Sequence, residues 1–365
     1  MHTVKKEVYD KAIGVLGKCA NKNGIYAAYP GYDAVWSRDS MITSLGGSLN
    51  DDKQYKNSFR QSLILLGKYQ SEKGQIPNAV DIFSRRNKHV DYGSIDSSLW
   101  WVLGHFVYNE RYGGSLLKES MPKIKKAMVW LDYQDFSEKG ILQQLPTTDW
   151  QDAFPHRYGT TINTQALYYK VLKLMGEDSK ARKLKDVVNN SKDEGLWNKE
   201  YYLSYRWKNH NKYKEKGEWF DSLGNLLAIL FDLADENKAQ KILKYIEKNK
   251  INKPYPIKAM WPAIRKGSKY WEDYFSDCDA RDAYSYLNGG IWTYIGGFYI
   301  LALLKYNKKN VGYELERLAK ANNKGMFSEW IHGRTGEISG EDSQAWNAGM
   351  YVLAYESVLR NKVLI

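Results

Sequence analysis

The sequence predicts an all-α protein of the (α/α)6 barrel class, in which six helical hairpins follow one another around a ring. Apolar residues recur with helical spacing along most of the chain, long and short connections alternate, and similar polar and aromatic segments precede every second helix. The 365 residues suffice for a large core, and no linker rich in proline, glycine and serine interrupts them. We therefore expect one domain over residues 1–365.

Helical periodicity indicates about twelve helices, whereas strand-like alternation is scarce. The expected helices cover residues 3–19, 39–48, 52–71, 95–109, 115–132, 160–174, 178–190, 220–233, 236–248, 289–305, 310–321 and 343–361. Connections after the even helices are tight, which favours antiparallel neighbours, and those after the odd helices are long. Long loops in a compact domain are commonly functional, so six of them leaving one end would build a site.

The segments that enter the even helices resemble one another. They read WSRDS, SIDSSLWW, TDWQDAF, EWFDSLGN, NGGIW and EDSQAW. Their anchors are separated by 57, 56, 69, 68 and 55 residues and are Asp39, Asp96, Asp152, Asp221, Gly289 and Gln344. A period of about 60 residues with one hairpin each is a repeat signature. Asp and Ser at such places also suit N-caps, but capping does not explain the Trp beside nearly every one.

Composition disfavours several classes of protein and site. The net charge of +12 is spread along the chain rather than clustered, so we expect no nucleic-acid partner. No apolar run approaches 18 residues, so no membrane association is expected. Two cysteines and the absence of a secretory pattern at the start favour the cytoplasm. Scattered histidines without HExxH or CxxC spacing predict no metal and no cofactor, while homo-oligomerisation stays open.

Aromatic residues and carboxylates are the residues of this sequence that indicate its function. The chain has 13 Trp and 29 Tyr, and aromatic faces are suited to the C–H faces of sugars as well as to core packing. No GxSxG elbow or P-loop is present. Carboxylates in aromatic surroundings are typical of glycoside cleavage, in which one acid protonates the leaving oxygen and one carboxylate activates water.

Eight segments support a family resemblance. In chain order they are WSRDS, HVDYGSIDSSLWW, DWQDAFPHRYGTTINTQALYYKVL, FDSLGNLLAIL, MWPAI, NGGIWTYIGGFYILAL, FSEWIHGRTGE and SQAWNAG. In this order they resemble neutral/alkaline invertases and the amylo-α-1,6-glucosidase domains of glycogen-debranching enzymes, over about residues 25–360. The resemblance implies the (α/α)6 fold, Asp152 as general acid, thirteen residues before Gln165, and Glu329 as general base. Asp149 is a rival acid, and Glu337 and Glu341 are rival bases.

The same motifs and the aromatic helix entries imply a set of sugar contacts. We expect them at Trp36, Arg38, Asp39, Asp96, Trp100, Trp150, Arg157, Asn288, Trp292, Gln344 and Trp346. We also expect Asp152 to lie against an apolar wall, Trp150, that raises the pKa of its carboxyl and keeps it protonated.

The predicted function is that of an inverting glycoside hydrolase acting on a short α-glucoside, either an oligosaccharide or a glucosylated small molecule. Ala153 and Phe154 stand where invertases carry two arginines, and Asn163 replaces the Glu that opens the relatives' next helix. These departures disfavour sucrose, although a sucrose-cleaving invertase remains an alternative. A sugar epimerase using His156 or His332 as acid or base, or a non-catalytic carbohydrate-binding protein, is the alternative from another class.

Overall fold

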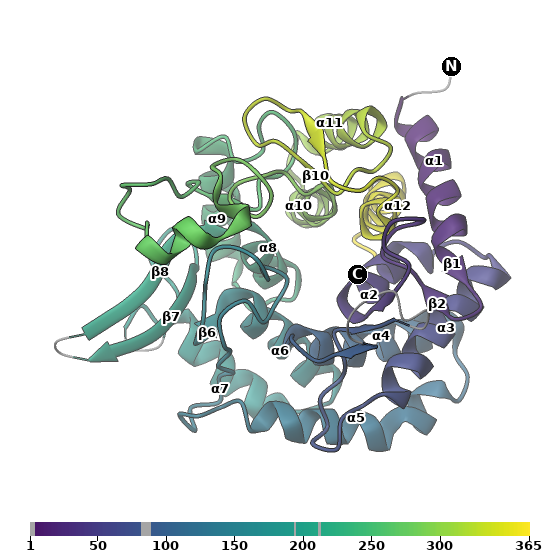
Figure 1. The fold of residues 1–365 in the computed structure, drawn as a ribbon, viewed down its shortest axis with the longest axis horizontal. Coiled ribbons are helices and arrows are strands. Elements are labelled where there is room, and N and C mark those ends of the chain that lie inside the picture. Colours follow the sequence, from purple (N-terminus) through teal and green to yellow (C-terminus); the bar gives the residue numbers. More distant parts are fainter. Residues whose placement is uncertain (1–3, 82–88, 193–194, 211–212) are drawn as a thin grey trace. The chain divides into compact units, whose positions relative to one another are not determined.

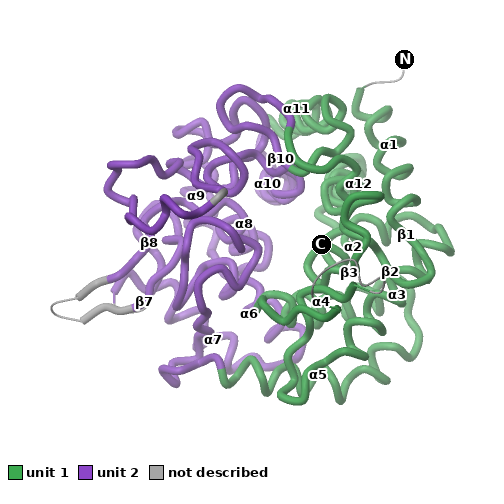
Figure 2. The backbone as a smooth tube through the Cα atoms, in the orientation of Figure 1, with its two compact units in different colours: residues 1–133, 309–329, 339–365 green, residues 134–308, 330–338 purple. Residues whose placement is uncertain are grey.

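The computed structural model describes residues 4–81, 89–192, 195–210 and 213–365. These residues form two compact units, coloured separately in Figure 2. Unit 1 comprises Met1–Tyr133, Lys309–Glu329 and Ser339–Ile365, and unit 2 comprises Gln134–Lys308 and Trp330–Ile338. Twelve α-helices occur within the described ranges, with short strands at the entries of several of them (Figure 1).

Unit 1 contains seven of these helices. They are α1 (Val4–Cys19), α2 (Ser37–Gly47), α3 (Lys53–Lys68), α4 (Asp96–Tyr112), α5 (Leu116–Asp132), α11 (Val311–Lys324) and α12 (Ala345–Leu359). Its strands have two residues each and are β1 (Ala20–Asn21), β2 (Gly24–Ile25), β3 (Val35–Trp36), β4 (Ala79–Val80) and β5 (Val90–Asp91). β1 pairs with β2, and β3–β4–β5 form a small antiparallel sheet in the loops that lead into α2 and α4.

The core of unit 1 is built around α2, all of whose residues are buried. It packs against α12 on one side and α4 on the other, while α1, α3, α5 and α11 cover these three helices. Glycine sets the closeness of the α2–α12 contact, because a Cβ atom on Gly46 would lie 1.8 Å from the carbonyl oxygen of Gly349. The two helix backbones therefore touch directly, which only glycine permits.

Unit 2 contains the remaining helices and the longest strands. Its helices are α6 (Ile162–Leu174), α7 (Asp178–Asn189), α8 (Ser222–Leu230), α9 (Glu236–Lys248) and α10 (Thr293–Lys305), with 3-10 turns at Asp273–Asp277 and Asp279–Arg281. Its strands are β6 (Thr160–Thr161), β7 (Leu203–His210), β8 (Tyr213–Asp221), β9 (Met260–Trp261) and β10 (Trp330–Ile331). β10 pairs with β11 (Ile338–Ser339), whose second residue belongs to unit 1.

In unit 2 the helix α8 takes the central place. All nine of its residues are buried, and it packs against both α6 and α10. The outer helix α9 is amphipathic instead, burying only Ala239, Ile242, Leu243 and Ile246, at the spacing of one helical face. Strands β6, β7, β8 and β9 form an antiparallel sheet in that order, and its β7–β8 hairpin extends away from the helices of this unit (Figure 1).

Every predicted helix is present, with ends within four residues of the predicted ones. The alternation of short and long connections is confirmed in the same way. The β7–β8 hairpin is the feature that sequence reasoning missed, since residues 191–219 were expected to be a loop. The hairpin buries aromatic residues such as Tyr205 and Trp219. The lysine- and asparagine-rich run 208–216 lies between them in the sequence and obscures the strand pattern.

Capping explains little of the recurring helix entries. Of the six anchors, only Asp221 accepts a hydrogen bond as an N-cap, from the backbone N–H of Gly224 at 3.2 Å. Asp39 and Asp96 lie inside the first turns of α2 and α4, and the N-cap residue Gln344 makes no side-chain cap bond. Ser40, the second serine of the WSRDS segment, is not an N-cap either, because it lies within α2 and donates to the carbonyl of Ile25.

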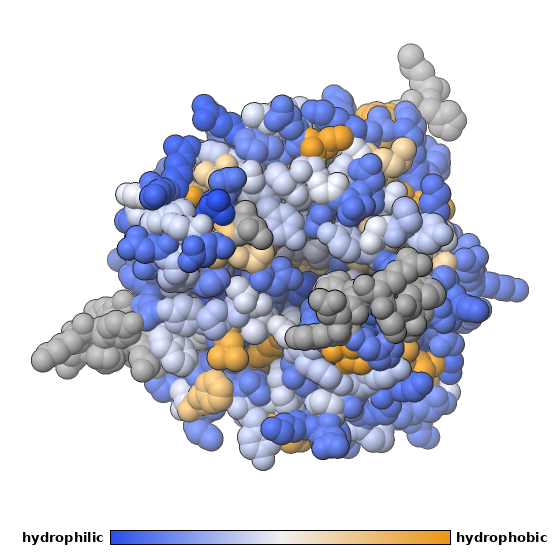
Figure 3. Space-filling model, in the orientation of Figure 1, coloured by the Kyte–Doolittle hydropathy of each residue, from blue (hydrophilic) through white to orange (hydrophobic). Residues whose placement is uncertain are grey.

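The face of the molecule drawn in Figure 3 is mainly hydrophilic, as the mean hydropathy of −0.61 predicts. No helix in the described ranges is long and apolar enough to cross a membrane.

His105 on α4 makes the stability of the protein depend on pH. It is 1% exposed, and burial lowers the pKa of its imidazole from 6.5 to about 4. The unfolded chain therefore binds the proton more readily, so stability is complete above pH 6.5 and falls as the pH drops toward 4. Urea unfolding should show a loss of about 2 kcal/mol from this residue between pH 7 and pH 5.

His105→Gln should flatten that dependence, since glutamine does not titrate. Equal pH dependence in His105→Gln and in the unaltered protein would show that another group is responsible.

Candidate active site

Glu329 lies in a tightly fixed turn of unit 1 between α11 and α12. Its side chain is 8% exposed, and its Oε2 accepts a hydrogen bond from the backbone N–H of Glu341 at 3.3 Å. Its own N–H donates to the carbonyl of Glu341 at 2.8 Å. Gly340 has a φ of +76°, and a Cβ atom there would lie 2.4 Å from Oε2 of Glu329, so this close approach requires glycine.

The chain before Glu329 is held in an uncommon backbone conformation. Met326 and Phe327 both have positive φ values, 46° and 61°, and the ring of Phe327 is buried against Tyr351. The carbonyl of Phe327 accepts the N–H of Gln344, the N-cap residue of α12, at 3.0 Å. Non-glycine residues with positive φ cluster at functional sites, because surrounding contacts must hold them there.

The two rival bases differ from Glu329 in their surroundings. Glu337, in unit 2, is exposed and accepts a hydrogen bond from the Thr335 hydroxyl within the turn. Glu341 is exposed, and its carboxylate lies against Gly31. Of the three carboxylates, Glu329 alone is buried and bonded to backbone, which is the kind of fixed position that a general base needs.

Arg38 and Asp96 join the first turns of α2 and α4 in unit 1. One Arg38 nitrogen donates to both carboxylate oxygens of Asp96, at 2.9 and 3.1 Å, and both side chains are buried. The Ser94 hydroxyl also donates to Asp96. Arg38 belongs to the WSRDS segment, in which we expected sugar contacts, but its side chain joins two inner helices.

Two of the predicted sugar contacts in unit 1, Trp100 and Gln344, have donors without a partner among the described residues. Trp100 is 0% and Gln344 is 2% exposed, yet neither the indole N–H nor the amide N–H has a hydrogen-bond partner in the part of the chain that the structure describes. Buried donors without partners are uncommon, and water or a ligand hydroxyl usually accepts from them. Asp39 and Trp346 are buried at 8% and 7% exposure, and Trp36 is half-buried at the end of β3.

The loop that follows α5 is anchored in unit 2 by a fully buried ion-pair network. Arg157 donates to Asp149 at 2.7 Å and also to Asp221, and all three side chains are 0% exposed. Asp149 further accepts from the Gln144 amide at 3.0 Å and from the N–H of Gln151 at 2.9 Å. Burial opposes the charge on Arg157, but the two carboxylates outweigh this and raise the pKa of its guanidinium.

This network changes the interpretation of two predicted residues. Arg157 was expected to touch substrate, but its N–H groups are directed at two aspartates. Asp149 was a rival acid, but both of its oxygens already accept hydrogen bonds from the protein and one of them faces the Arg157 guanidinium, so its carboxylate is engaged within the fold. Because Asp221 is the N-cap of α8, the network fastens the 149–157 loop to a central helix.

Asp152 lies in the middle of this loop and is solvent-exposed. The prediction that it would be buried against Trp150 is therefore wrong, since Trp150 turns inward and is 2% exposed. Trp150 packs edge-to-face on Trp292 and Tyr294, at ring centroid distances of 6.1 and 5.9 Å. Its side chain faces the aromatic cluster at the start of α10, while Asp152 reaches solvent from the same loop.

Asn288 holds loops together. Its amide N–H groups donate to the carbonyls of Ile264 and Arg281, at 2.8 and 2.7 Å, and its oxygen accepts the N–H of Ile264 at 2.7 Å. These bonds use both amide hydrogens of Asn288, so its side chain has no donor left for a sugar. Trp292 donates its indole N–H to the Tyr286 carbonyl at 3.0 Å and keeps its ring for packing.

Two buried amides were missed by sequence reasoning. Gln151 and Asn163 are both 0% exposed, and neither side chain has a hydrogen-bond partner among the described residues. Gln151 directly precedes Asp152, and Asn163 replaces the glutamate of the resembling families. The sequence distinguished only Asn163, because it replaces a glutamate of the resembling families. Composition does not show whether a buried amide has hydrogen-bond partners.

The histidines named for an epimerase have structural partners. His332 Nδ1 accepts the backbone N–H of Thr335 at 3.0 Å, which closes a turn. His156 stacks on Tyr274, with ring centroids 5.0 Å apart, and burial lowers the pKa of its imidazole. Within the described residues no three His, Cys, Asp or Glu side chains converge as metal ligands would.

Comparison with known families identifies the chain. The family model described as amylo-alpha-1,6-glucosidase matches residues 10–358. The chain belongs to the amylo-α-1,6-glucosidase family. It is thus a glycoside hydrolase, and the resemblance found in its motifs is confirmed.

Two plant invertases are similar to this amylo-α-1,6-glucosidase family member over most of its length. Cytosolic invertase 1 of Oryza sativa subsp. japonica is 22% identical, over 88% of this chain and 71% of its own. Probable alkaline/neutral invertase F of Arabidopsis thaliana is 23% identical, over 88% of this chain and 80% of its own.

Solved structures share the fold of this family member. A GH63 mannosylglycerate hydrolase from Thermus thermophilus, in complex with Tris and D-glycerate, has a TM-score of 0.70 at 14% identity, covering 94% of this chain and 99% of its own. A rhamnosidase from Klebsiella oxytoca with rhamnose bound has a TM-score of 0.68 at 13% identity, covering 97% and 64%. The predicted all-α (α/α)6 barrel class is confirmed.

Removing Arg157 should destabilise the protein strongly. Arg157→Met leaves Asp149 and Asp221 buried without their cation, and breaking a buried pair in this way costs about 3–5 kcal/mol. Urea unfolding measures this loss. The triple variant Asp149→Asn, Arg157→Met, Asp221→Asn should recover part of it, because no uncompensated charge remains. An unchanged urea midpoint for Arg157→Met would contradict the role of this network.

Proposed function

We propose that the chain is an inverting glycosidase that hydrolyses a short α-glucoside, with Asp152 as general acid and Glu329 as general base. Asp152 protonates the leaving oxygen, and Glu329 removes a proton from the water that attacks the anomeric carbon from the opposite face. Inversion requires the two carboxyl groups to be about 6.5–9.5 Å apart when substrate is bound, which leaves room for that water.

The assignment of the acid rests on the contrast between Asp149 and Asp152. Both oxygens of Asp149 already accept hydrogen bonds from the protein, one of them from Arg157, whereas Asp152 is exposed and lies three residues further along the same anchored loop. A bound sugar that covers Asp152 would remove water from its carboxyl, which is the usual way to raise the pKa of a catalytic acid. Bound substrate would thus enclose the Asp152 carboxyl.

The assignment of the base rests on the fixed turn around Glu329. The backbone N–H of Glu341 donates to its carboxylate, which holds the side chain in one orientation. Buried donors at Trp100, Gln344 and Trp150 have no protein acceptor among the described residues, and sugar hydroxyls are acceptors of the right kind.

The family match supports an α-1,6 linkage to glucose as the first substrate to test. Sucrose is the second candidate, because two plant invertases match 88% of the chain. Ala153 and Phe154, in place of the paired arginines of invertases, weigh against it. Family membership in a glycosidase group weighs against an epimerase or a binding protein. A cytoplasmic location is consistent with two cysteines outside any disulfide and with the cytosolic invertase relative.

Asp152→Asn and Glu329→Gln should each lower the turnover of isomaltose by at least about a thousandfold, because each removes one half of the proton transfer. Asp149→Asn is the matched control, since it alters the neighbouring carboxylate of the same loop. It should keep substantially more activity. Greater loss in Asp149→Asn than in Asp152→Asn would reverse the assignment of the acid.

The stereochemical outcome tests the inverting mechanism. With α-glucosyl fluoride, which releases glucose only from the cleaved glycoside, proton NMR of the unaltered enzyme should show β-glucose as the first product, followed by mutarotation. α-Glucose as the first product would indicate retention and would remove Glu329 from the role of a base.

A further inference from the structure

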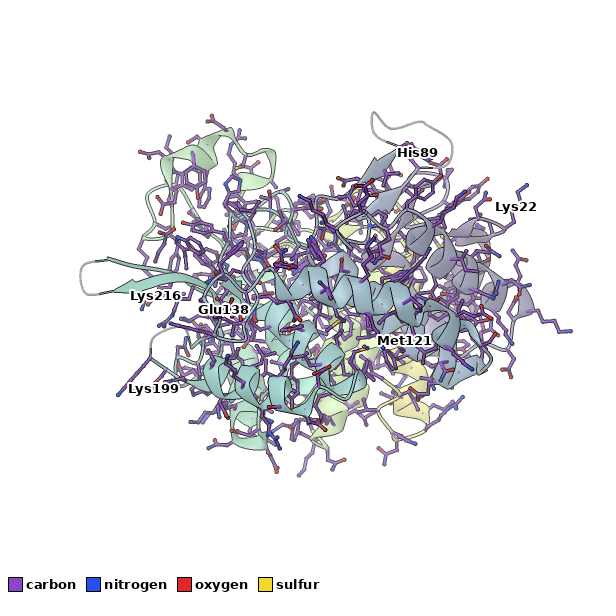
Figure 4. All side chains as sticks on the ribbon, turned by 90° about the horizontal axis from the view of Figure 1, so that it is seen from below. Lys22, His89, Met121, Glu138, Lys199 and Lys216 are labelled. Atoms are coloured by element: carbon purple, nitrogen blue, oxygen red, sulfur yellow. The ribbon has the colours of Figure 1, made fainter. Side chains whose placement is uncertain are left out.

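A cavity of about 460 Å³ in unit 2 has positively charged walls and contains neither of the two residues proposed for catalysis. Its volume is within the size range of small-molecule sites. The walls come from the loop after α7, from strands β7 and β8, and from residues 269–270. Among the described residues, its charged side chains are Lys199, Arg206, Lys216, Glu218 and Lys269. Figure 4 labels Lys199 and Lys216, which lie at the same edge of unit 2.

The carboxylate of this wall is already shared between two lysines. Lys216 lies 2.6 Å from Oε1 of Glu218, and Lys269 lies 3.1 Å from Oε2. The hydrogen bond from Lys216, together with that from Lys269, lowers the pKa of the Glu218 carboxyl and keeps it ionised. With Lys199, three lysines face one glutamate, so the wall has an excess of two positive charges even without its arginine.

The sheet adds an independent indication of a negatively charged ligand. Arg206 on β7 and Lys216 on β8 are direct partners across the antiparallel pair. Like charges in such positions repel each other and destabilise a sheet. An anion bound beside both side chains reduces that repulsion, and it gains two charge-assisted hydrogen bonds.

Local structure holds two of the lysines in place before any ligand binds. Lys199 has a φ of +86°, in a turn that Asn198 closes by accepting the N–H groups of the two residues after Lys199, at 3.0 and 2.9 Å. The Nζ atom of Lys269 lies 4.5 Å from the ring centroid of Tyr270. Binding to groups that are already ordered costs less conformational entropy.

A small phosphate monoester fits this combination of charge and volume. It carries about two negative charges at neutral pH, which the excess of lysines balances. Lysine and arginine are the usual partners of phosphate oxygens. The cavity is larger than a phosphate group alone requires, and Tyr270, which is half-buried in its wall, offers a ring face to the organic part of a ligand.

We propose that this cavity binds a small phosphate monoester, with the phosphate held by the lysines and the organic part against Tyr270. The site is separate from Asp152 and Glu329. Its test measures binding alone, so it succeeds or fails independently of the function proposed above.

Calorimetry with ribose 5-phosphate at low ionic strength tests the proposal, because this probe carries no glucose that the proposed active site could bind. The double variant Lys199→Gln, Lys269→Gln should raise Kd at least about tenfold, since two of the cations are lost. The matched control is Lys241→Gln, Lys244→Gln, which removes two exposed lysines of α9 that do not line the cavity. The control should change Kd less than about twofold, because screening weakens distant charges.

Glu218→Gln should have the opposite effect and lower Kd at least about threefold. The variant removes the carboxylate that competes with the ligand for Lys216 and Lys269. Because the Glu218 side chain is 36% exposed and its ion pairs lie at the surface, the fold should be retained. A purely structural role of Glu218 would not make binding tighter.

Ribose 5-phosphate should bind more tightly than inorganic phosphate, and its affinity should fall as sodium chloride is added. Absence of binding at low ionic strength, an equal loss in the control variant, or unchanged or weaker binding in Glu218→Gln would overturn the proposal. Equal affinity for inorganic phosphate and ribose 5-phosphate would overturn the assignment to a monoester.

Discussion

The buried contact of Arg157 with Asp149 and Asp221 is the interaction on which the 149–157 loop of unit 2 depends. A guanidinium without solvent exposure is tolerable only because two carboxylates face it, and each of them has further donors. Removing these charged groups from water costs free energy, and the contacts that result hold the loop in one position. The network fixes a long irregular loop to the N-terminus of α8, and the segment that it fixes contains Asp152 at its centre.

In unit 1 a buried ion pair and backbone hydrogen bonds likewise hold the segments at the helix entries. Arg38 joins Asp96 across the first turns of two inner helices, and backbone bonds fix the turn of Glu329. In both units the inner helices are buried nearly all round, and the buried ion pairs of Arg38 and of Asp221 lie at the ends where the long loops enter. This division leaves the helices to provide stability and the loops to provide chemistry.

The sequence predicted the helices well because apolar spacing, short turns and long loops are all local signals. The family and the fold class followed from motifs in a fixed order. The hydrogen-bond partners of buried side chains could not be predicted from the sequence. Arg157 and Asn288 are residue types that often bind sugars, but Arg157 donates to Asp149 and Asp221, and Asn288 donates to backbone carbonyls. Nothing local to FPHR or NGGIW indicates such distant partners. The exposure of Asp152 and the β7–β8 hairpin were missed for the same reason, since each depends on contacts between separate segments.

The central claim is the division of roles between Asp152 and Glu329, and α-glucosyl fluoride tests it most directly. Fluoride departs without a proton, so the acid is dispensable with this substrate while the base is still needed. We expect Asp152→Asn to hydrolyse α-glucosyl fluoride at a rate near that of the unaltered enzyme, and Glu329→Gln to be inactive on it. Loss of activity in Asp152→Asn together with retained activity in Glu329→Gln would contradict the account.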